Sequence, residues 1–343
     1  MVTKPLFALS ALCTALLLVL ITCQRLTPSQ PATDIAVKGA AVELAATAHN
    51  VLAGRLPGPE YSLITTTLGS EAAKELSLHP DFAGVAIDLL RQAGVQPGDR
   101  IAVNVSGSFP GLNISVLSAV TALGAQPLLI SSVGASTWGA TDPFDTWLDM
   151  EHSLQKAGLP WRSLAASPGG VGDHGGGLSK EGLALIRLAI ERNGVPELGS
   201  TSVTDGIAKR LALYRDENGK LPAALINVGG SHVIFGSRGH ASPLRQGITR
   251  GYRPSPVVSD SLAAPFLAAN RPVIHFINIR RLAARYQIAA ESPPGSASVF
   301  REQRLSPPLR AFALTGLAAA IAGLWQGRRR GLWQLTHRPS TGS

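Results

Sequence analysis

The chain is poor in cysteine, aromatic residues and charged residues, and each shortage excludes a class of protein. Two cysteines in 343 residues are too few for a disulfide scaffold or a cysteine-rich zinc site. Aromatic residues make up 5% of the chain, and no zinc-finger, RNA-recognition or helix-turn-helix pattern occurs, so nucleic acid is not an expected partner. Charged residues make up 15% against 45% hydrophobic residues, which excludes disorder and suggests that part of the chain lies in lipid.

Acidic residues are scarce in the last third of the chain. From His240 to Ser343 there are 14 Arg and three acidic residues, whereas the preceding residues hold 17 Lys and Arg against 19 acidic residues. Such asymmetry usually marks contact with a polyanion or an anionic membrane surface. Arg binds a carboxylate through two parallel hydrogen bonds, which Lys does not. The candidates for polyanion contact are Arg280, Arg281 and Arg285; the alternative is that they form, with Arg245, Arg250 and Arg253, a solvated or membrane-facing rim.

Two uncharged segments near the ends of the chain are expected to span a membrane. Pro5–Cys23 is long enough for a hydrocarbon core, and Ala311–Gly327 is shorter and rich in Ala and Gly. A cleaved signal peptide or a lipidated Cys23 is the alternative for the first segment. A buried amphipathic helix is the alternative for the second.

The arginines that follow the second segment set the expected topology. Arg328–Arg330 indicate a cytoplasmic C-terminus under the positive-inside rule. Two spans then place both termini in the cytoplasm and the body outside, so the chain is expected in the cell membrane. The expected parts are an N-terminal anchor (1–24), an α/β body (25–295), a linker (296–310), a second transmembrane helix (311–327) and a basic cytoplasmic tail (328–343).

Strand and helix patterns alternate through the body. Arg100–Val105 and Gln126–Ser131 are continuous apolar strands on either side of a Gly-rich turn and a helical run, which is typical of a βαβ unit. Continuous apolar strands predict a sheet covered on both faces. The predicted fold is α/β, a Rossmann-like, mostly parallel sheet with helices on both faces, flanked by N- and C-terminal transmembrane helices. Further strands are expected at 225–228 and 272–276, and helices at 32–53, 70–93 (two), 112–123, 142–156, 179–193, 260–270 and 279–286.

Three loops follow predicted strands, where ligands bind in open α/β sheets. Ser106–Gly111 offers hydroxyls, backbone N–H groups and a helix N-terminus to an anion, although it matches neither the P-loop nor the dinucleotide fingerprint. Ser131–Ala140 is rich in hydroxyls with one Trp, and Asn227–His232 is rich in Gly. In each case the alternative is a structural turn.

No recognised catalytic constellation occurs, so whether the chain is an enzyme stays open. Ser231 and His232 are neighbours in sequence, which does not make them a nucleophile–base pair, and no nucleophile elbow appears. The Gly-rich run Ser167–Leu178, which contains Asp173, is expected to be a flexible surface loop, with a lid or a metal contact as alternatives. His275 is expected to be a core histidine. No metal site and no cofactor is assigned.

Several of these segments together resemble the bacterial poly-γ-glutamate system protein family. The resemblance spans roughly Tyr61 to Tyr286 and implies a membrane-associated accessory of poly-γ-glutamate synthesis or export. It carries over no catalytic residue, and Ser231 stands where a third Gly is expected. The segments are Ile64–Ser70, His79–Phe82, Ser106–Asn113, Ser131–Ala140, Thr146–Glu151 and Ile226–Gly230.

The expected function is therefore that of a membrane-anchored accessory protein that binds the anionic polymer or a partner in the synthase and export complex. One alternative is a hydrolase or amide ligase that acts on the γ-linked polymer through the strand-end loops. Another is a purely structural tether. The ligand-binding candidates are Ser106, Gly107, Ser108, Gly111, Asn113, Ser131, Ser132, Ser136, Trp138, Asp149, Glu151, Asn227, Gly229 and Gly230.

Overall fold

The computed structural model describes residues 32–236, 244, 246–251, 260–300 and 322. Most of the described residues belong to one compact unit, Thr33–Arg301. Apart from residue 322, both expected membrane spans and the expected basic tail lie outside the described residues. Within the described residues, no helix is long and apolar enough to cross a membrane.

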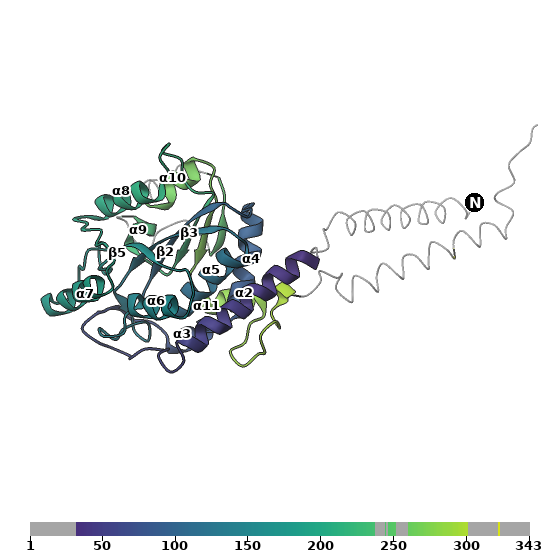
Figure 1. Cartoon of the computed structure of the whole chain (residues 1–343), viewed down its shortest axis with the longest axis horizontal. Helices are drawn as coiled ribbons and strands as arrows, with labels where there is room; N and C mark the ends of the chain where they lie inside the picture. Colours follow the sequence, from purple (N-terminus) through teal and green to yellow (C-terminus); the bar gives the residue numbers. More distant parts are fainter. Residues whose placement is uncertain (1–31, 237–243, 245, 252–259, 301–321, 323–343) are drawn as a thin grey trace, which may run out of the picture. The chain divides into compact units, whose positions relative to one another are not determined.

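A six-stranded sheet forms the centre of the compact unit (Figure 1). Its strand order is β5-β3-β2-β6-β8-β7, and every strand is parallel to its neighbours except β7, which pairs antiparallel with β8. The prediction of an α/β fold with a mostly parallel sheet is confirmed. The strands are β2 (Arg100–Ser106), β3 (Gln126–Ser132), β5 (Ser163–Ser167), β6 (Ala224–Val228), β7 (Gly247–Thr249) and β8 (Val273–Phe276).

Helices cover both faces of this sheet because its strands send alternate apolar side chains into two cores. On β2, Ile101 and Val103 belong to one core and Ala102 belongs to the other. The first core includes residues of α2 (Ala32–Val51), α4 (Asp81–Ala93), α5 (Pro110–Ala122), α6 (Trp147–Lys156), α7 (Lys180–Arg192) and α11 (Ile279–Tyr286). The second core includes residues of α8 (Val203–Tyr214), α9 (His232–Phe235) and α10 (Ala263–Ala268).

Three smaller elements, β1 (Thr65–Thr67), β4 (Ala135–Ser136) and α3 (Glu71–Ser77), lie near the carboxyl ends of the central strands. A two-stranded parallel sheet joins β1 to β4. The short helix α3 packs against α5 and α11. These elements bring the segment after β3 beside the segment that precedes α3.

A row of polar side chains crosses the second core near the carboxyl ends of the strands. Asn104, Asn227 and His275 are adjacent in register on β2, β6 and β8, and Ser132 pairs with Ser167 on β3 and β5. All five residues are buried. On each of five neighbouring strands, the face that packs into the second core thus carries a polar side chain instead of an apolar one near the same end of the sheet.

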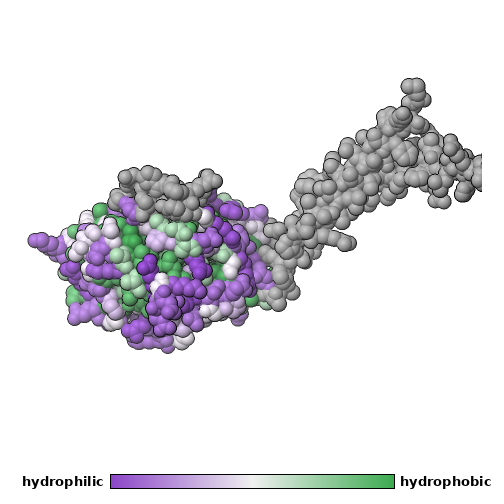
Figure 2. All heavy atoms as spheres, turned by 90° about the horizontal axis from the view of Figure 1, so that it is seen from above, coloured by the Kyte–Doolittle hydropathy of each residue, from purple (hydrophilic) through white to green (hydrophobic). Residues whose placement is uncertain are grey.

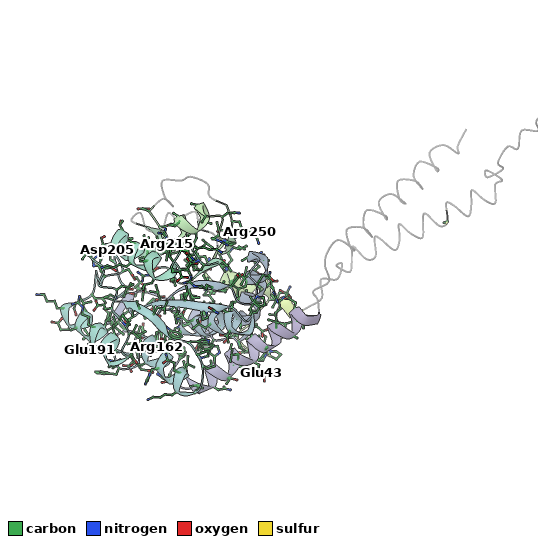
Figure 3. The ribbon with its side chains drawn as sticks, turned by 45° about the horizontal axis from the view of Figure 1, so that its top comes forward. Glu43, Arg162, Glu191, Asp205, Arg215 and Arg250 are labelled. Atoms are coloured by element: carbon green, nitrogen blue, oxygen red, sulfur yellow. The ribbon has the colours of Figure 1, made fainter. Side chains whose placement is uncertain are left out.

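Many charged side chains lie at the periphery of the unit, although several others are buried. Seen from the side of α8 and α10, hydrophobic residues gather in a band that hydrophilic residues surround (Figure 2). The charged residues labelled in Figure 3 extend outward from the ribbon: Glu43, Arg162, Glu191, Asp205, Arg215 and Arg250.

The last described segment packs back onto the start of the unit. The buried carboxylate of Asp81 accepts hydrogen bonds from the backbone N–H groups of Gly295 (2.6 Å) and Ala297 (2.8 Å). Lys38 on α2 donates to the carbonyl of Val299 at 3.2 Å. The first residues of the expected linker, 296–300, therefore contact α2 and α4.

Candidate functional site

A cleft of about 90 Å³ opens where the parallel strands end. Five segments line it: β1, the β2–α5 turn, the β3–β4 turn, the Gly-rich loop that follows β5, and the β6–α9 turn. The cleft therefore lies where the sequence places ligand binding. Of the candidates, Ser106, Ser108, Ser132 and Gly230 line the cleft.

The cleft wall contains hydrogen-bond donors that the described chain leaves without acceptors. Among the described residues, nothing accepts the backbone N–H groups of Ser108, Gly170 and Gly230. The hydroxyl of Ser106 is buried and also has no described partner. The Ser106 hydroxyl is the buried donor of this set, and buried donors are nearly always hydrogen-bonded, whereas the residues Ser108 and Gly170 are half-buried and Gly230 is exposed. Because N–H groups that line one cleft attract anions, this wall suits an acceptor-rich anionic ligand.

A buried ion pair forms the floor of the cleft. Nη2 of Arg210, on α8, lies 2.6 Å from Oδ2 of Asp173, and both side chains are almost completely buried. Ser132 donates to Oδ1 of Asp173 at 2.6 Å, and Arg210 donates to Ser167 (2.9 Å) and Asn104 (3.0 Å). Among the described residues, Asp173 is the only carboxylate that lines the cleft, and Arg210 balances its charge.

The Gly-rich loop thus differs from the expected flexible surface loop at Asp173. The side chain of Asp173 is 1% exposed, and its backbone has a φ of 65°, in the left-handed region. The sequence feature that could have indicated a buried Asp173 is its partner Arg210, which lies among the apolar residues of α8. Sequence reasoning missed Arg210.

Asn227 links the floor to the β6–α9 turn. Its Oδ1 accepts from Nδ2 of Asn104 at 2.7 Å, and its Nδ2 donates to the carbonyl of Gly229 (2.6 Å) and to Nδ1 of His275 (3.0 Å). Burial lowers the pKa of His275 to about 4, so the ring is neutral. Gly229 has a φ of 86°, which favours glycine. Asn227 and Gly229 therefore shape the turn that presents Gly230.

The β2–α5 turn is shaped by close backbone contacts. A Cβ on Gly107 would overlap the carbonyl oxygen of Val133, and a Cβ on Gly111 would lie 2.6 Å from the carbonyl oxygen of Ser77. The side chain of Asn113 donates to the carbonyl of Ser106 at 2.9 Å. These three candidates position the turn rather than line the cleft.

Lys74 lies behind the turn, and sequence reasoning missed it because a helical Lys is usually solvated. Its side chain is buried, donates to the carbonyl of Ser108 and to Oγ of Ser136 (2.7 Å), and lies 3.8 Å from the centre of the Phe109 ring. Burial lowers the pKa of Lys74 to about 7. The candidate Ser136 therefore contacts a buried amine and does not line the cleft.

Four other candidates lie away from the cleft and connect neighbouring elements. Ser131 shares a hydrogen bond with Ser163 at 2.7 Å, and the buried carboxyl of Glu151 accepts from the Ser163 backbone at 2.5 Å. Asp149 forms an ion pair with Arg192 at 2.5 Å, which joins α6 to α7. The backbone N–H of Trp138 donates to the backbone carbonyl of Pro59 at 3.2 Å.

The arginine candidates form a separate surface. Arg280, Arg281 and Arg285 are exposed on α11, and none forms an ion pair with a described residue or lines the cleft. Arg250 is also exposed, whereas Arg245 and Arg253 lie outside the described residues. We call Arg280, Arg281 and Arg285 the α11 arginine surface.

Comparison with known proteins adds no assignment. No family model, no curated protein and no solved structure matches the chain. Within the described ranges, no group of three or more His, Cys, Asp or Glu side chains is placed to hold a metal ion.

Proposed function

We propose that the chain is a membrane-associated accessory protein of poly-γ-glutamate synthesis or export, and that its strand-end cleft binds carboxylate groups of the polymer. One observation carries this proposal. Four of the six segments that resemble the poly-γ-glutamate system family contribute residues to a single cleft. They are Ile64–Ser70, Ser106–Asn113, Ser131–Ala140 and Ile226–Gly230.

The chemistry of the cleft supports a carboxylate ligand. In the part of the chain that the structure describes, its wall offers N–H and hydroxyl donors without acceptors, and the single carboxylate in its lining is already paired with Arg210. Poly-γ-glutamate carries one carboxylate per residue. The α11 arginine surface adds positive charge that attracts such a chain over long range, in a way that salt weakens.

The expected location belongs to the same proposal. The uncharged segments 5–23 and 311–327 would anchor the chain in the cell membrane, with both termini in the cytoplasm. The compact unit would then meet the polymer on the outer side, beside the synthase and export complex.

The test is binding of γ-linked glutamate oligomers to the full-length chain in detergent, measured by calorimetry. The double variant Ser106→Ala, Ser108→Ala should bind about a hundredfold or more weakly, because it loses two hydrogen bonds to a charged group and each is worth roughly 1.5–3 kcal/mol. Ser118→Ala is the matched control, because Ser118 is a buried serine of α5 that does not line the cleft. Unchanged binding by the double variant, with binding lost on replacing Arg280, Arg281 and Arg285 by Ala, would move the site to the α11 arginine surface.

The second candidate function is hydrolysis of the γ-linked amide. It is favoured by the 2.7 Å contact between Oγ of Ser136 and the amine of Lys74, an arrangement that activates nucleophiles. Because Ser136 is buried and does not line the cleft, the segment around it would have to open before Ser136 could attack the amide carbonyl. The proton of Ser136 would then pass through Lys74 to the leaving amine, and water would hydrolyse the acyl ester. A fluorophosphonate adduct on Ser136, lost in Lys74→Met, would support this reaction, whereas its absence together with no glutamate release would exclude it.

A further inference from the structure

Two lysines of the compact unit are fully buried, and they differ in their counter-ions. Lys38 lies 3.6 Å from a carboxylate oxygen of Asp34 and 3.6 Å from one of Asp88. Lys74 has no carboxylate within ion-pair distance among the described residues. A buried ammonium group without a counter-ion is costly, because it loses hydration and gains no opposite charge. The site around Lys74 therefore lacks one negative charge.

Lys74 contacts the back of the cleft wall directly. Its amine donates to the carbonyl of Ser108, whose own N–H has no acceptor and which lines the cleft. The ring of Phe109, the next residue, lies 3.8 Å from the amine. An anion held by the Ser108 turn would therefore be separated from the Lys74 amine by one residue of backbone.

No other charged group of the neighbouring elements supplies the missing charge. On α3, Glu71 and Glu75 are exposed, and α5 and β4 contain no charged residue. The arginines of α11 are exposed and carry the same sign as Lys74. His79 is buried beside the start of α4, where its ring accepts from the Asp81 backbone and contacts Ser292. Across the cleft, His232 accepts from the N–H of Gly172 at 3.2 Å.

We propose that a carboxylate bound in the cleft serves as the missing counter-ion of Lys74, so that anion binding is coupled to proton uptake by this lysine. The inference rests on the proposed function for the identity of the ligand. It adds that Lys74 is a positioning residue that acts through the Ser108 turn and makes the cleft sensitive to pH.

The direction of the pH dependence follows from the burial of the amine. Burial lowers the pKa of Lys74 to about 7, and a nearby anion raises it again. Below this pKa the free protein is already charged and binds the anion without taking up a proton. Above it, each binding event recruits a proton, so the affinity falls by up to about tenfold per pH unit.

The experiment is calorimetry on the full-length chain in detergent at pH 7.5, in two buffers with different heats of ionisation. The probes are γ-linked tri-glutamate and, separately, succinate. We expect roughly one-half to one proton taken up per ligand bound. Lys74→Met should take up none and should bind at least tenfold more weakly than the wild type at pH 6. Lys74→Arg, which keeps a permanent charge, should bind with an affinity that does not change between pH 6 and 8.5.

Two control variants separate Lys74 from other titratable groups. Lys38→Met removes the other buried lysine, which does not line the cleft, and should leave proton uptake unchanged. His232→Gln removes the imidazole of the cleft, and proton uptake should persist even if affinity changes. Persistent uptake in a folded Lys74→Met or Lys74→Arg protein would overturn the inference.

The two probes distinguish failure of this inference from failure of the proposed function. Binding of succinate with proton uptake, but no binding of tri-glutamate, would overturn the polymer ligand and leave the role of Lys74 standing. Binding of tri-glutamate without proton uptake would overturn the role of Lys74 alone. No binding of either probe would overturn both.

Discussion

Among single residues, Arg210 makes the contact whose loss should matter most for folding. Its guanidinium is fully buried and paired with Asp173. Removing one partner of such a pair leaves an uncompensated buried charge, so we expect Arg210→Met to lower the free energy of unfolding by about 3–5 kcal/mol. Urea denaturation followed by Trp fluorescence measures this change.

A second substitution separates the charge from the packing around Arg210. In the double variant Arg210→Met, Asp173→Asn the unpaired charge is gone, and stability should recover in part. Arg187→Met is the surface control, because its partner Glu197 lies 3.4 Å away in an exposed pair worth less than about 1 kcal/mol. Equal effects at positions 210 and 187 would contradict the assigned role of the buried pair.

Glu151 makes the stability of the unit depend on pH. Burial raises the pKa of this carboxyl from 4.5 to about 7, so the folded state favours the protonated form. Its contribution to stability is complete below about pH 4.5 and is lost as the pH rises through 7. By linkage this amounts to roughly 3 kcal/mol.

Glu151→Gln should therefore flatten the curve of unfolding free energy against pH between 5 and 8. The amide stays neutral throughout this range and can still bond to Ser163. Thermal unfolding at several pH values checks this, with the exposed Glu191→Gln as control. A curve as steep as that of the wild type would assign the pH dependence to another group.

Sequence reasoning at this scale found the cleft serines but missed the charges behind them. Ser106, Ser108 and Ser132 follow apolar strands, a position that topology alone marks as a binding edge. Lys74 and Arg210 lie on helices, where the same residue types are usually solvated. Lys74 turns inward because α3 packs against α5 and α11, and Arg210 turns inward because α8 packs over the sheet. No local sequence pattern encodes that packing.

At the scale of an element, the β2–α5 turn depends on a close backbone approach. Gly107→Ala would place a methyl group against the carbonyl of Val133, a backbone atom that cannot rotate away. We expect a loss of roughly 1–3 kcal/mol in unfolding free energy and weaker oligomer binding, because the turn that carries Ser108 must shift.

Gly39→Ala is the control for this change. Gly39 lies on α2 with nothing within 4 Å of the added Cβ, so the substitution should stabilise the helix by up to about 1 kcal/mol. Chemical denaturation compares both variants with the wild type. A Gly107→Ala protein as stable as the wild type would show that the loop after β3 can move aside.

Sequence reasoning located the strands that are mainly apolar runs, and also the helix α11. β2, β3, β6, β8 and α11 occur close to where they are expected. β5 was missed because Ser163–Ser167 is short and built from Ser, Ala and Leu, and β7 because it is a three-residue edge strand. The predicted helix from Asp142 begins instead at Trp147, where the carboxylate of Asp149 accepts the N–H of Thr146 at 2.7 Å.

For the whole molecule, the proposed topology can be tested because the compact unit contains no cysteine. Cys13 and Cys23 both lie in the first expected span. A cysteine introduced as Asn218→Cys, in an exposed turn after α8, should react with a membrane-impermeant maleimide in intact cells if the unit is outside. Reaction only after the cells are broken would place the unit in the cytoplasm and contradict the proposal.

The hydrogen bond from Lys38 on α2 to the carbonyl of Val299 holds the first helix of the compact unit beside the last residues of that unit. A domain whose two ends lie close together can be inserted into a loop of an unrelated host protein without separating the two ends of that loop. The compact unit, with its sheet and its cleft, is therefore suited to insertion as a whole domain into another protein.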